Sequence, residues 1–259
     1  MAKHFNELSK KLNSFQYQFD LSNLFNDLLT MGICAYHSTN IQSQLQIKDE
    51  ANEALYLETI KGYSKEQLIT LSEALGILQL NVLDAPYTDL LGEFFMQEIS
   101  KGHNGQFFTP DSLCEMMASF CGIRPEDENK NCIDPACGSG RMLLAGAKMN
   151  PNHYFYGADN SQVCAKMATL NFFLNGLRGE VAWMNTLSME WYGGWHINLN
   201  GLGITPIKKE QSLIWTDASK VKAPEKIHVQ SAKVEGKAST KPDAKPSNTQ
   251  PSQGQLSLF

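Results

Sequence analysis

A glycine-rich segment, Asp134–Gly140, has the residue types of a loop that binds a nucleotide-like ligand. It reads Asp-Pro-Ala-Cys-Gly-Ser-Gly and lies between an apolar run that predicts a strand and a helix predicted to begin near Arg141. Glycine lets a backbone turn sharply and approach a ligand closely, and the next helix presents free N–H groups at its first turn. An ordinary strand-to-helix turn uses the same residues, so the loop alone does not decide the matter.

Two further segments favour a ligand site. Asp159 ends the next predicted strand, at the spacing where an acidic side chain can accept hydrogen bonds from both hydroxyls of a ribose. Its other interpretation is as a cap for the helix beginning near Ser161, and one carboxylate can do both. Upstream, Gly105–Pro110 ends in Thr109 and Pro110, a good N-cap and first-turn pair.

Strand and helix patterns alternate around the loop, from Gly102 to about Trp215. The candidate strands are Cys132–Pro135, Tyr154–Ala158 and Val181–Met184. One apolar helix face precedes the last strand, formed by Val163, Met167, Leu170 and Leu174. Asn175-Gly176 predicts a left-handed end to that helix. We therefore expect an α/β fold with a parallel sheet and crossover helices over residues 102–216.

Residues 1–101 predict a small helical domain. One helix has a capping box at Ser64 and Gln67, followed by an apolar face formed by Leu68, Leu71, Leu75 and Leu78. A second is expected from about Leu21 to Cys34, with Ser22 as its cap and with Phe25, Leu28 and Leu29 turned inward. A third is expected from about Thr88 to Ile99, with an apolar face of Leu91, Phe94 and Phe95.

Residues 217–259 predict a flexible tail. They are rich in Lys, Ser, Pro, Gln and Thr, with seven lysines against four acids. Such a segment buries too little apolar surface to offset its ordering entropy.

Composition excludes several classes of protein. The chain has 259 residues, 42% of them hydrophobic, and a net charge of −5, which argues against non-specific coating of nucleic acid. Six scattered cysteines and no histidine spacing suited to a metal argue against a zinc site or a disulfide framework. Without a predicted signal peptide or membrane span, we expect a cytoplasmic protein.

The three segments, in this order, resemble the adenine-N6 DNA methyltransferases, in particular the methylation subunits of type I restriction-modification systems and related phage and mobile-element proteins. The match runs from about Leu91 to Leu187. It implies a Rossmann-like domain that binds S-adenosylmethionine, acts on DNA and works with a specificity subunit. The residues expected by resemblance to contact this cofactor are Phe107, Phe108, Thr109, Pro110, Asp134, Ala136, Gly138, Gly140, Asp159, Asn160 and Asn185.

The chain departs from this family where the target base is held. Members that methylate adenine carry Asn/Asp-Pro-Pro-Tyr/Phe after the fourth strand, and none follows Leu187. Trp191–Asn198 stands there instead, and Tyr192, Trp195 and Asn198 are the candidates for a stacking face and an acceptor. The other interpretation is that these aromatic residues cover the open edge of a shortened sheet.

Two functions stay open. The chain is expected to transfer a methyl group to adenine in DNA, alone or with a partner, or to be a cofactor- and partner-binding module without catalysis. The resemblance favours the first, and the missing acceptor motif favours the second.

The last five residues, Gln255–Phe259, resemble the short peptide with which bacterial replication and repair proteins bind the DNA sliding clamp. The expected contacts are Gln255, Leu256, Leu258 and Phe259. The other interpretation is a chance apolar end. Apolar residues are otherwise sparse in the tail, and a tethered terminal peptide is freely accessible, which favours binding.

Overall fold

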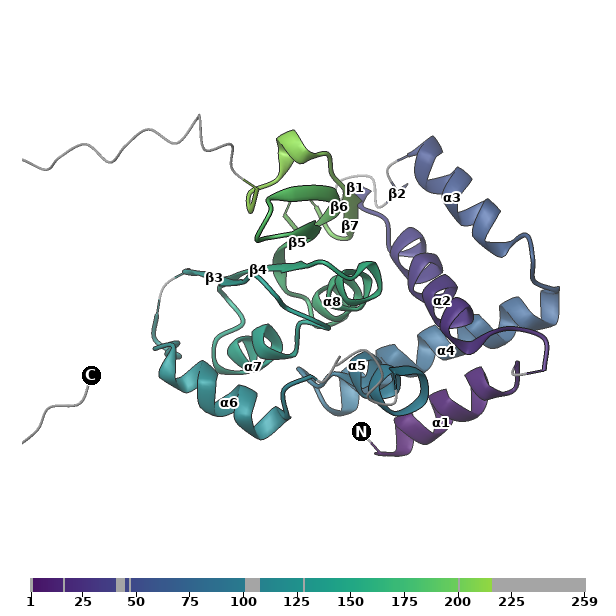
Figure 1. Cartoon of the computed structure of the whole chain (residues 1–259), viewed down its shortest axis with the longest axis horizontal. Helices are drawn as coiled ribbons and strands as arrows, with labels where there is room; N and C mark the ends of the chain where they lie inside the picture. Colours follow the sequence, from purple (N-terminus) through teal and green to yellow (C-terminus); the bar gives the residue numbers. More distant parts are fainter. Residues whose placement is uncertain are drawn as a thin grey trace, which may run out of the picture. The chain divides into compact units, whose positions relative to one another are not determined.

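Figure 1 shows a group of helices and one main sheet. Helices α1 to α6 precede this sheet along the chain, and α7 and α8 connect its first three strands. The computed structural model describes residues 2–15, 17–40, 45–46, 48–100, 108–127, 129–199 and 201–215. The helices are α1 (Ala2–Asn13), α2 (Leu21–Ala35), α3 (Glu50–Ile60), α4 (Lys65–Asp84), α5 (Leu90–Phe94), the π-helix η1 (Phe95–Ser100), α6 (Asp111–Phe120), α7 (Arg141–Met149), α8 (Gln162–Leu174) and the 3-10 helix η3 (Lys209–Gln211). The strands are β1 (Thr39–Asn40), β2 (Leu45–Gln46), β3 (Asn131–Asp134), β4 (Tyr154–Asp159), β5 (Arg178–Asn185), β6 (Glu190–Ile197) and β7 (Ile204–Pro206).

The main sheet has five strands in the order β3-β4-β5-β6-β7. The first three are parallel and are joined by the crossover helices α7 and α8, as the alternating pattern predicts. Strands β6 and β7 are antiparallel additions, and β6 contains the aromatic segment that follows Leu187. The sheet is therefore mixed, with its parallel half beside the glycine-rich loop.

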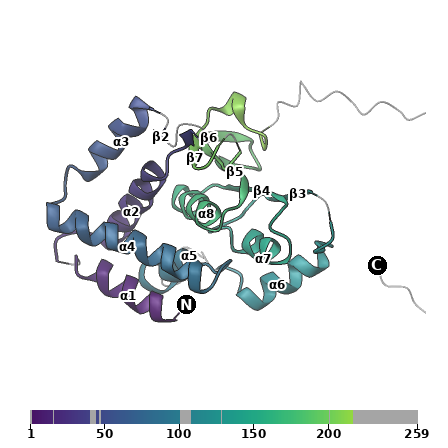
Figure 2. The same ribbon diagram turned by 180° about the vertical axis from the view of Figure 1, so that it is seen from behind.

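Helices α7 and α8 cover one face of the sheet, as seen from both sides in Figures 1 and 2. The core on that face contains Leu143, Leu144, Phe155, Ala168, Phe172 and Val181. On the other face, a smaller cluster of Ala158, Ala182 and Met184 is covered by Trp191, Ile214 and Trp215. Among the described residues, α-helices cover the first face, whereas the short segment after η3 packs on the second.

The helices of the first hundred residues share a core with the sheet-bearing part. The largest cluster joins Leu8, Leu28, Leu71 and Phe94 to Met167 and Leu170 of α8. The described residues consequently belong to one compact unit, although the sequence pattern changes near residue 101.

Several local predictions are confirmed. The Ser64–Gln67 capping box is present at the start of α4. Helix α8 ends at Leu174, and Gly176 follows with φ +68°. The three parallel strands lie where they were expected, with bounds that differ by a few residues. All six cysteines are free thiols, and four of them are buried.

Other predictions need correction. The cap of α2 is Asp20 and not Ser22, because the Asp20 side chain accepts a hydrogen bond from the Asn23 N–H at 2.9 Å. The helix expected from Thr88 to Ile99 begins at Leu90 and widens into η1 at Phe95. Helix α6 begins one residue later than predicted, with Pro110 at its N-cap position and no capping side chain.

No helix among the described residues is long and apolar enough to cross a membrane. Residues 217–259 lie outside the part of the chain that the structure describes.

Candidate functional site

The glycine-rich loop connects the end of β3 to the start of α7. Gly138 and Gly140 both have left-handed backbone angles, with φ +55° and +85°. A Cβ atom on Gly138 would lie 2.9 Å from the ring of Phe108, and one on Gly140 would lie 3.0 Å from the ring of Phe172. The contact at Gly138 is closer than real Cβ atoms show and the one at Gly140 is tight, and the positive φ angles strain any other residue, so the loop favours glycine at both positions.

Asp159 joins the end of β4 to this loop. One oxygen of its carboxylate accepts a hydrogen bond from the Gly138 N–H at 2.8 Å, and the other accepts from the Ser161 N–H at 2.7 Å. The N-cap of α8 is Ser161, whose hydroxyl accepts from the Cys164 N–H. Asp159 thus holds the loop in place and supports the start of α8.

A second carboxylate, Asp134, lies at the end of β3. It accepts a hydrogen bond from the Ala136 N–H at 3.0 Å. Burial raises the pKa of Asp134, the Ala136 hydrogen bond lowers it, and the nearby charge of Asp159 raises it; the net change is upward. Two carboxylates that repel each other beside a loop favour a ligand with positive charge.

A cavity of about 230 Å³ lies over the loop. Its lining includes Phe108, Thr109, Asp134, Ala136, Gly138 and Arg141. Phe108 and Thr109 form the wall that comes from the segment before α6. Pro110 is exposed at the start of α6, and Phe107 lies outside the described residues.

Asn160 is the first residue after β4, and Asn185 is the last residue of β5. Both lie at the same edge of the parallel half of the sheet. The Asn160 carbonyl accepts a hydrogen bond from the indole N–H of Trp183 at 3.1 Å. The Asn185 side chain accepts from the Leu187 and Ser188 N–H groups and closes the turn after β5. The position of Trp183 beside Asn160 is not marked in the sequence, because a tryptophan within a strand follows no spacing that sets it apart.

Of the three candidates for catalysis, Tyr192 and Trp195 lie on β6, and Asn198 follows its last residue. Tyr192 is exposed near the carboxyl end of β5, with its ring 5.2 Å from that of Trp183. Trp195 is opposite Val181 and packs against the core.

Asn198 lies beyond the amino end of β5, because its neighbour Ile197 is opposite Gly179. Its amide donates to the Leu177 carbonyl at 2.8 Å and accepts from the Gly203 N–H at 2.9 Å. A strand advances about 3.3 Å per residue, so Asn198 lies nearly the whole length of β5 away from Asn185. The candidate acceptor Asn198 therefore does not lie beside Asp159: it closes a turn at the opposite end of the sheet.

A buried polar network behind the loop was not predicted from the sequence. Asp89, at the N-cap of α5, accepts hydrogen bonds from Ser139 and Arg141 of the loop and α7. Asn171 of α8 donates to both Asp89 and the Ser139 carbonyl. These residues are far apart in the chain and follow no common period.

Comparison with known proteins supports a relationship to DNA methylases. Residues 81–199 match the family model described as N-6 DNA Methylase. The type I restriction enzyme MjaVIII methylase subunit of Methanocaldococcus jannaschii is 33% identical over 97 residues, which are 34% of this chain and 16% of that protein. The MjaVII methylase subunit of the same organism is 28% identical over 102 residues, which are 36% of this chain and 17% of that protein. The match thus spans about a sixth of each of these two relatives.

Two solved structures show a weak similarity. One, from Listeria monocytogenes and assigned to the class I S-adenosylmethionine-dependent methyltransferases, is 15% identical and covers 70% of this chain and 53% of its own, with a TM-score of 0.35. The other is a type I restriction-modification methyltransferase subunit from Streptococcus thermophilus, 20% identical, covering 67% of this chain and 36% of its own, with a TM-score of 0.32.

Proposed function

We propose that this chain, whose residues 81–199 belong to the N-6 DNA methylase family, binds S-adenosylmethionine at the Asp134–Gly140 loop and serves adenine-N6 methylation of DNA together with a partner. The observation that carries the proposal is the hydrogen bond from the Gly138 N–H to Asp159. It brings a glycine loop, a helix N-terminus and an acidic strand end together, which is the arrangement that binds an adenosine ribose.

The charges of the site favour this cofactor over a dinucleotide. S-adenosylmethionine carries a positive sulfonium and a positive amino group, which suit the neighbouring carboxylates of Asp134 and Asp159. A pyrophosphate would instead be repelled by these two carboxylates, and the nearby cation Arg141 is not free to offset them. Arg141 is already paired with Asp89 at 3.0 Å, and with Glu93 and Asp111 at 3.4 Å each.

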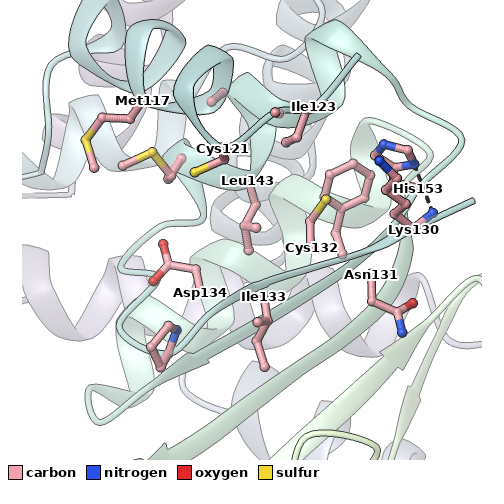
Figure 3. Close-up of a pocket in the computed structure, with 16 residues that line it drawn as sticks. Met117, Cys121, Ile123, Lys130, Asn131, Cys132, Ile133, Asp134, Leu143 and His153 are labelled. Atoms are coloured by element: carbon pink, nitrogen blue, oxygen red, sulfur yellow. Dashed lines mark hydrogen bonds between the residues drawn. The ribbon is translucent and has the colours of Figure 1, made fainter. Parts of the chain in front are cut away.

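The shape of the site supports a partner. Ligands of α/β sheets bind in a crevice with strands on both sides, and here β3 is the outer strand among the described residues. An apolar cavity of about 410 Å³ lies beside β3, between α6 and α7. Figure 3 shows Met117, Cys121, Cys132 and Leu143 around it, while Ile133 points to the other face of the strand and is 61% exposed. A specificity subunit or other DNA-bound partner would supply the missing wall.

The alternative function is a module that binds the cofactor without catalysis. The segment that follows β5 favours it, because no Asn/Asp-Pro-Pro-Tyr/Phe motif follows Leu187. The amino group of a target adenine needs an acceptor, which that motif would supply. Tyr192 offers a ring there, but its hydroxyl donates to Glu190 at 3.0 Å.

Calorimetric titration with S-adenosylmethionine tests cofactor binding. Asp159→Ala should weaken binding by about 1.5–3 kcal/mol, because it removes a charged acceptor. Asp49→Ala is the matched control, since the Asp49 side chain likewise accepts hydrogen bonds from backbone N–H groups at a helix start, but at that of α3. If both variants bind S-adenosylmethionine with the same affinity, Asp159 has only the structural role of accepting the Gly138 and Ser161 N–H groups.

Transfer of labelled methyl groups to DNA tests the reaction. The isolated chain should transfer little or none, and addition of the neighbouring-gene products should restore transfer. Strong adenine methylation by the chain alone would contradict the need for a partner. Binding of cofactor without transfer under all these conditions would establish the alternative.

A contact with the bacterial sliding clamp is also proposed, on the resemblance of Gln255–Phe259 to a clamp-binding peptide. These residues lie outside the described part of the chain. Fluorescence polarisation of the last dozen residues against the host clamp is the measurement, with Leu258 and Phe259 replaced by alanine as control. Binding that is absent, or that survives the double replacement, would rule the contact out.

A further inference from the structure

Asp89 is a buried carboxylate that collects four hydrogen bonds. Its side chain is 1% exposed. One oxygen accepts from the Gly92 N–H and from the Asn171 amide, each at 2.8 Å. The other accepts from the Ser139 hydroxyl at 2.5 Å and from Arg141 Nε at 3.0 Å. A buried carboxylate is tolerated when its lone pairs are satisfied in this way.

Two of these donors belong to the cofactor loop and the helix after it. Ser139 is completely buried, and its carbonyl also accepts a hydrogen bond from Asn171 at 2.9 Å. The loop residue between Gly138 and Gly140 is therefore held through both its side chain and its backbone. Asp89 and Asn171 hold it from α5 and α8, two elements that surround the loop.

Arg141 extends the network to the opposite wall of the cavity. Its terminal nitrogens donate to the Thr109 carbonyl and to Glu93, each at 3.4 Å. The guanidinium carbon also lies 5.9 Å from the centre of the Phe108 ring. Since Phe108 packs over Gly138, Arg141 ties the loop to the wall that faces it.

The fit at Asp89 leaves no spare room. A Cβ atom on Gly92 would lie 2.0 Å from the Asp89 carboxylate and 2.6 Å from the Ser139 hydroxyl. The carboxylate thus occupies the space that any side chain at position 92 would take.

We propose that Asp89 is a positioning residue for the cofactor: by holding Ser139 and Arg141 from the helical segment before the sheet, it sets the distance between the loop and the Phe108–Thr109 wall. The proposal rests on the proposed function, because the ligand it concerns is S-adenosylmethionine. A competing explanation is that Asp89 only caps α5 through its bond to Gly92.

The variant Asp89→Asn separates these explanations. Asparagine caps a helix as well as aspartate does, so a mere cap would be unaffected. If Asp89 is a positioning residue, the replacement keeps an oxygen for Gly92 but puts an amide nitrogen against the donors of Ser139 and Arg141. We expect the Kd for S-adenosylmethionine to rise at least about tenfold, which corresponds to about 1.4 kcal/mol. Asp20→Asn, the same change at the cap of α2, should leave the Kd unchanged.

A double-mutant cycle tests whether Asp89 acts through Arg141. Arg141→Gln keeps a polar group at the position of Nε but loses the contacts to Thr109 and Glu93. We expect about a tenfold loss of affinity from this variant and about the same loss, rather than about a hundredfold, from the combined Asp89→Asn and Arg141→Gln variant. If the losses of affinity in the two single variants add up in the combined variant, Asp89 does not act through Arg141.

Hydrogen exchange of the protein without cofactor provides a readout independent of binding. Asp89→Asn should speed amide exchange in the peptides covering residues 108–110 and 136–141, while α2 and α4 stay protected. The proposal would be overturned if exchange became faster throughout the chain, or if it did not become faster in these two groups of peptides. If the unaltered protein fails to bind S-adenosylmethionine, the proposed function falls, and the exchange data still decide whether Asp89 positions the loop.

Discussion

Replacement of Gly138 by alanine adds one methyl group where the loop meets the Phe108 wall. The backbone angle φ of +55° costs an alanine about 1–2 kcal/mol relative to glycine. The new Cβ would also lie 2.9 and 3.0 Å from two ring carbons of Phe108. Because that ring packs near Phe95 and Arg141, moving it costs roughly another 0.5–1.5 kcal/mol of off-rotamer strain.

Gly176→Ala is the matched control for this prediction. Gly176 has φ +68°, and an added Cβ would meet nothing within 4 Å, so this variant carries the backbone cost alone. Chemical unfolding should show Gly138→Ala to be about 1 kcal/mol less stable than Gly176→Ala. Calorimetry should show a loss of S-adenosylmethionine affinity in Gly138→Ala only. Equal stabilities together with equal affinities would refute the assignment of the Phe108 contact to cofactor binding.

Three further predictions follow from burial and charge. Burial raises the pKa of Asp134, so the affinity for the cofactor should be highest above that pKa and should fall as the pH drops through it. Calorimetry over a series of pH values measures this dependence, and Asp134→Asn should abolish it. Alkylation followed by mass spectrometry should label the exposed Cys121 first. Burial raises the pKa of Cys114 to about 11 and of Cys164 to about 12, and only the thiolate form reacts. Early labelling of either buried thiol would contradict the packing. Glu180→Ala should lower the free energy of unfolding, measured in denaturant, by about 1–3 kcal/mol. The fully buried carboxylate accepts hydrogen bonds from the Ser212 hydroxyl, the Leu213 N–H and the His196 ring, at 2.5, 2.6 and 3.2 Å. An unchanged midpoint of unfolding would show that water satisfies those donors.

Local interactions made several features of the fold predictable from sequence. The capping box of Ser64 and Gln67 and the left-handed glycine at 176 each depend on residues within a few positions of one another. The position of Asp159 at a strand end followed from alternation of apolar runs, and the structure places it against Gly138. At the starts of α2 and α6 the residue predicted as cap was wrong, because neighbouring residues of similar capping propensity, Asp20 and Ser22 for α2, cannot be ranked by residue type alone.

The sequence by itself therefore determined the alternation of strands and helices in the parallel half of the sheet, the loop and the acid that supports it, since these follow from short-range spacing and residue type. Tertiary structure alone decided which distant groups meet. Asp89 reaches Ser139 and Asn171 across separations of 50 and 82 residues, and no periodic pattern links them. Likewise, the aromatic segment after β5 pairs back as an antiparallel strand, which carries Asn198 to the far end of the sheet. The physical reason is that burial and hydrogen-bond satisfaction are properties of the packed chain, so they select among contacts that a linear pattern leaves equally open.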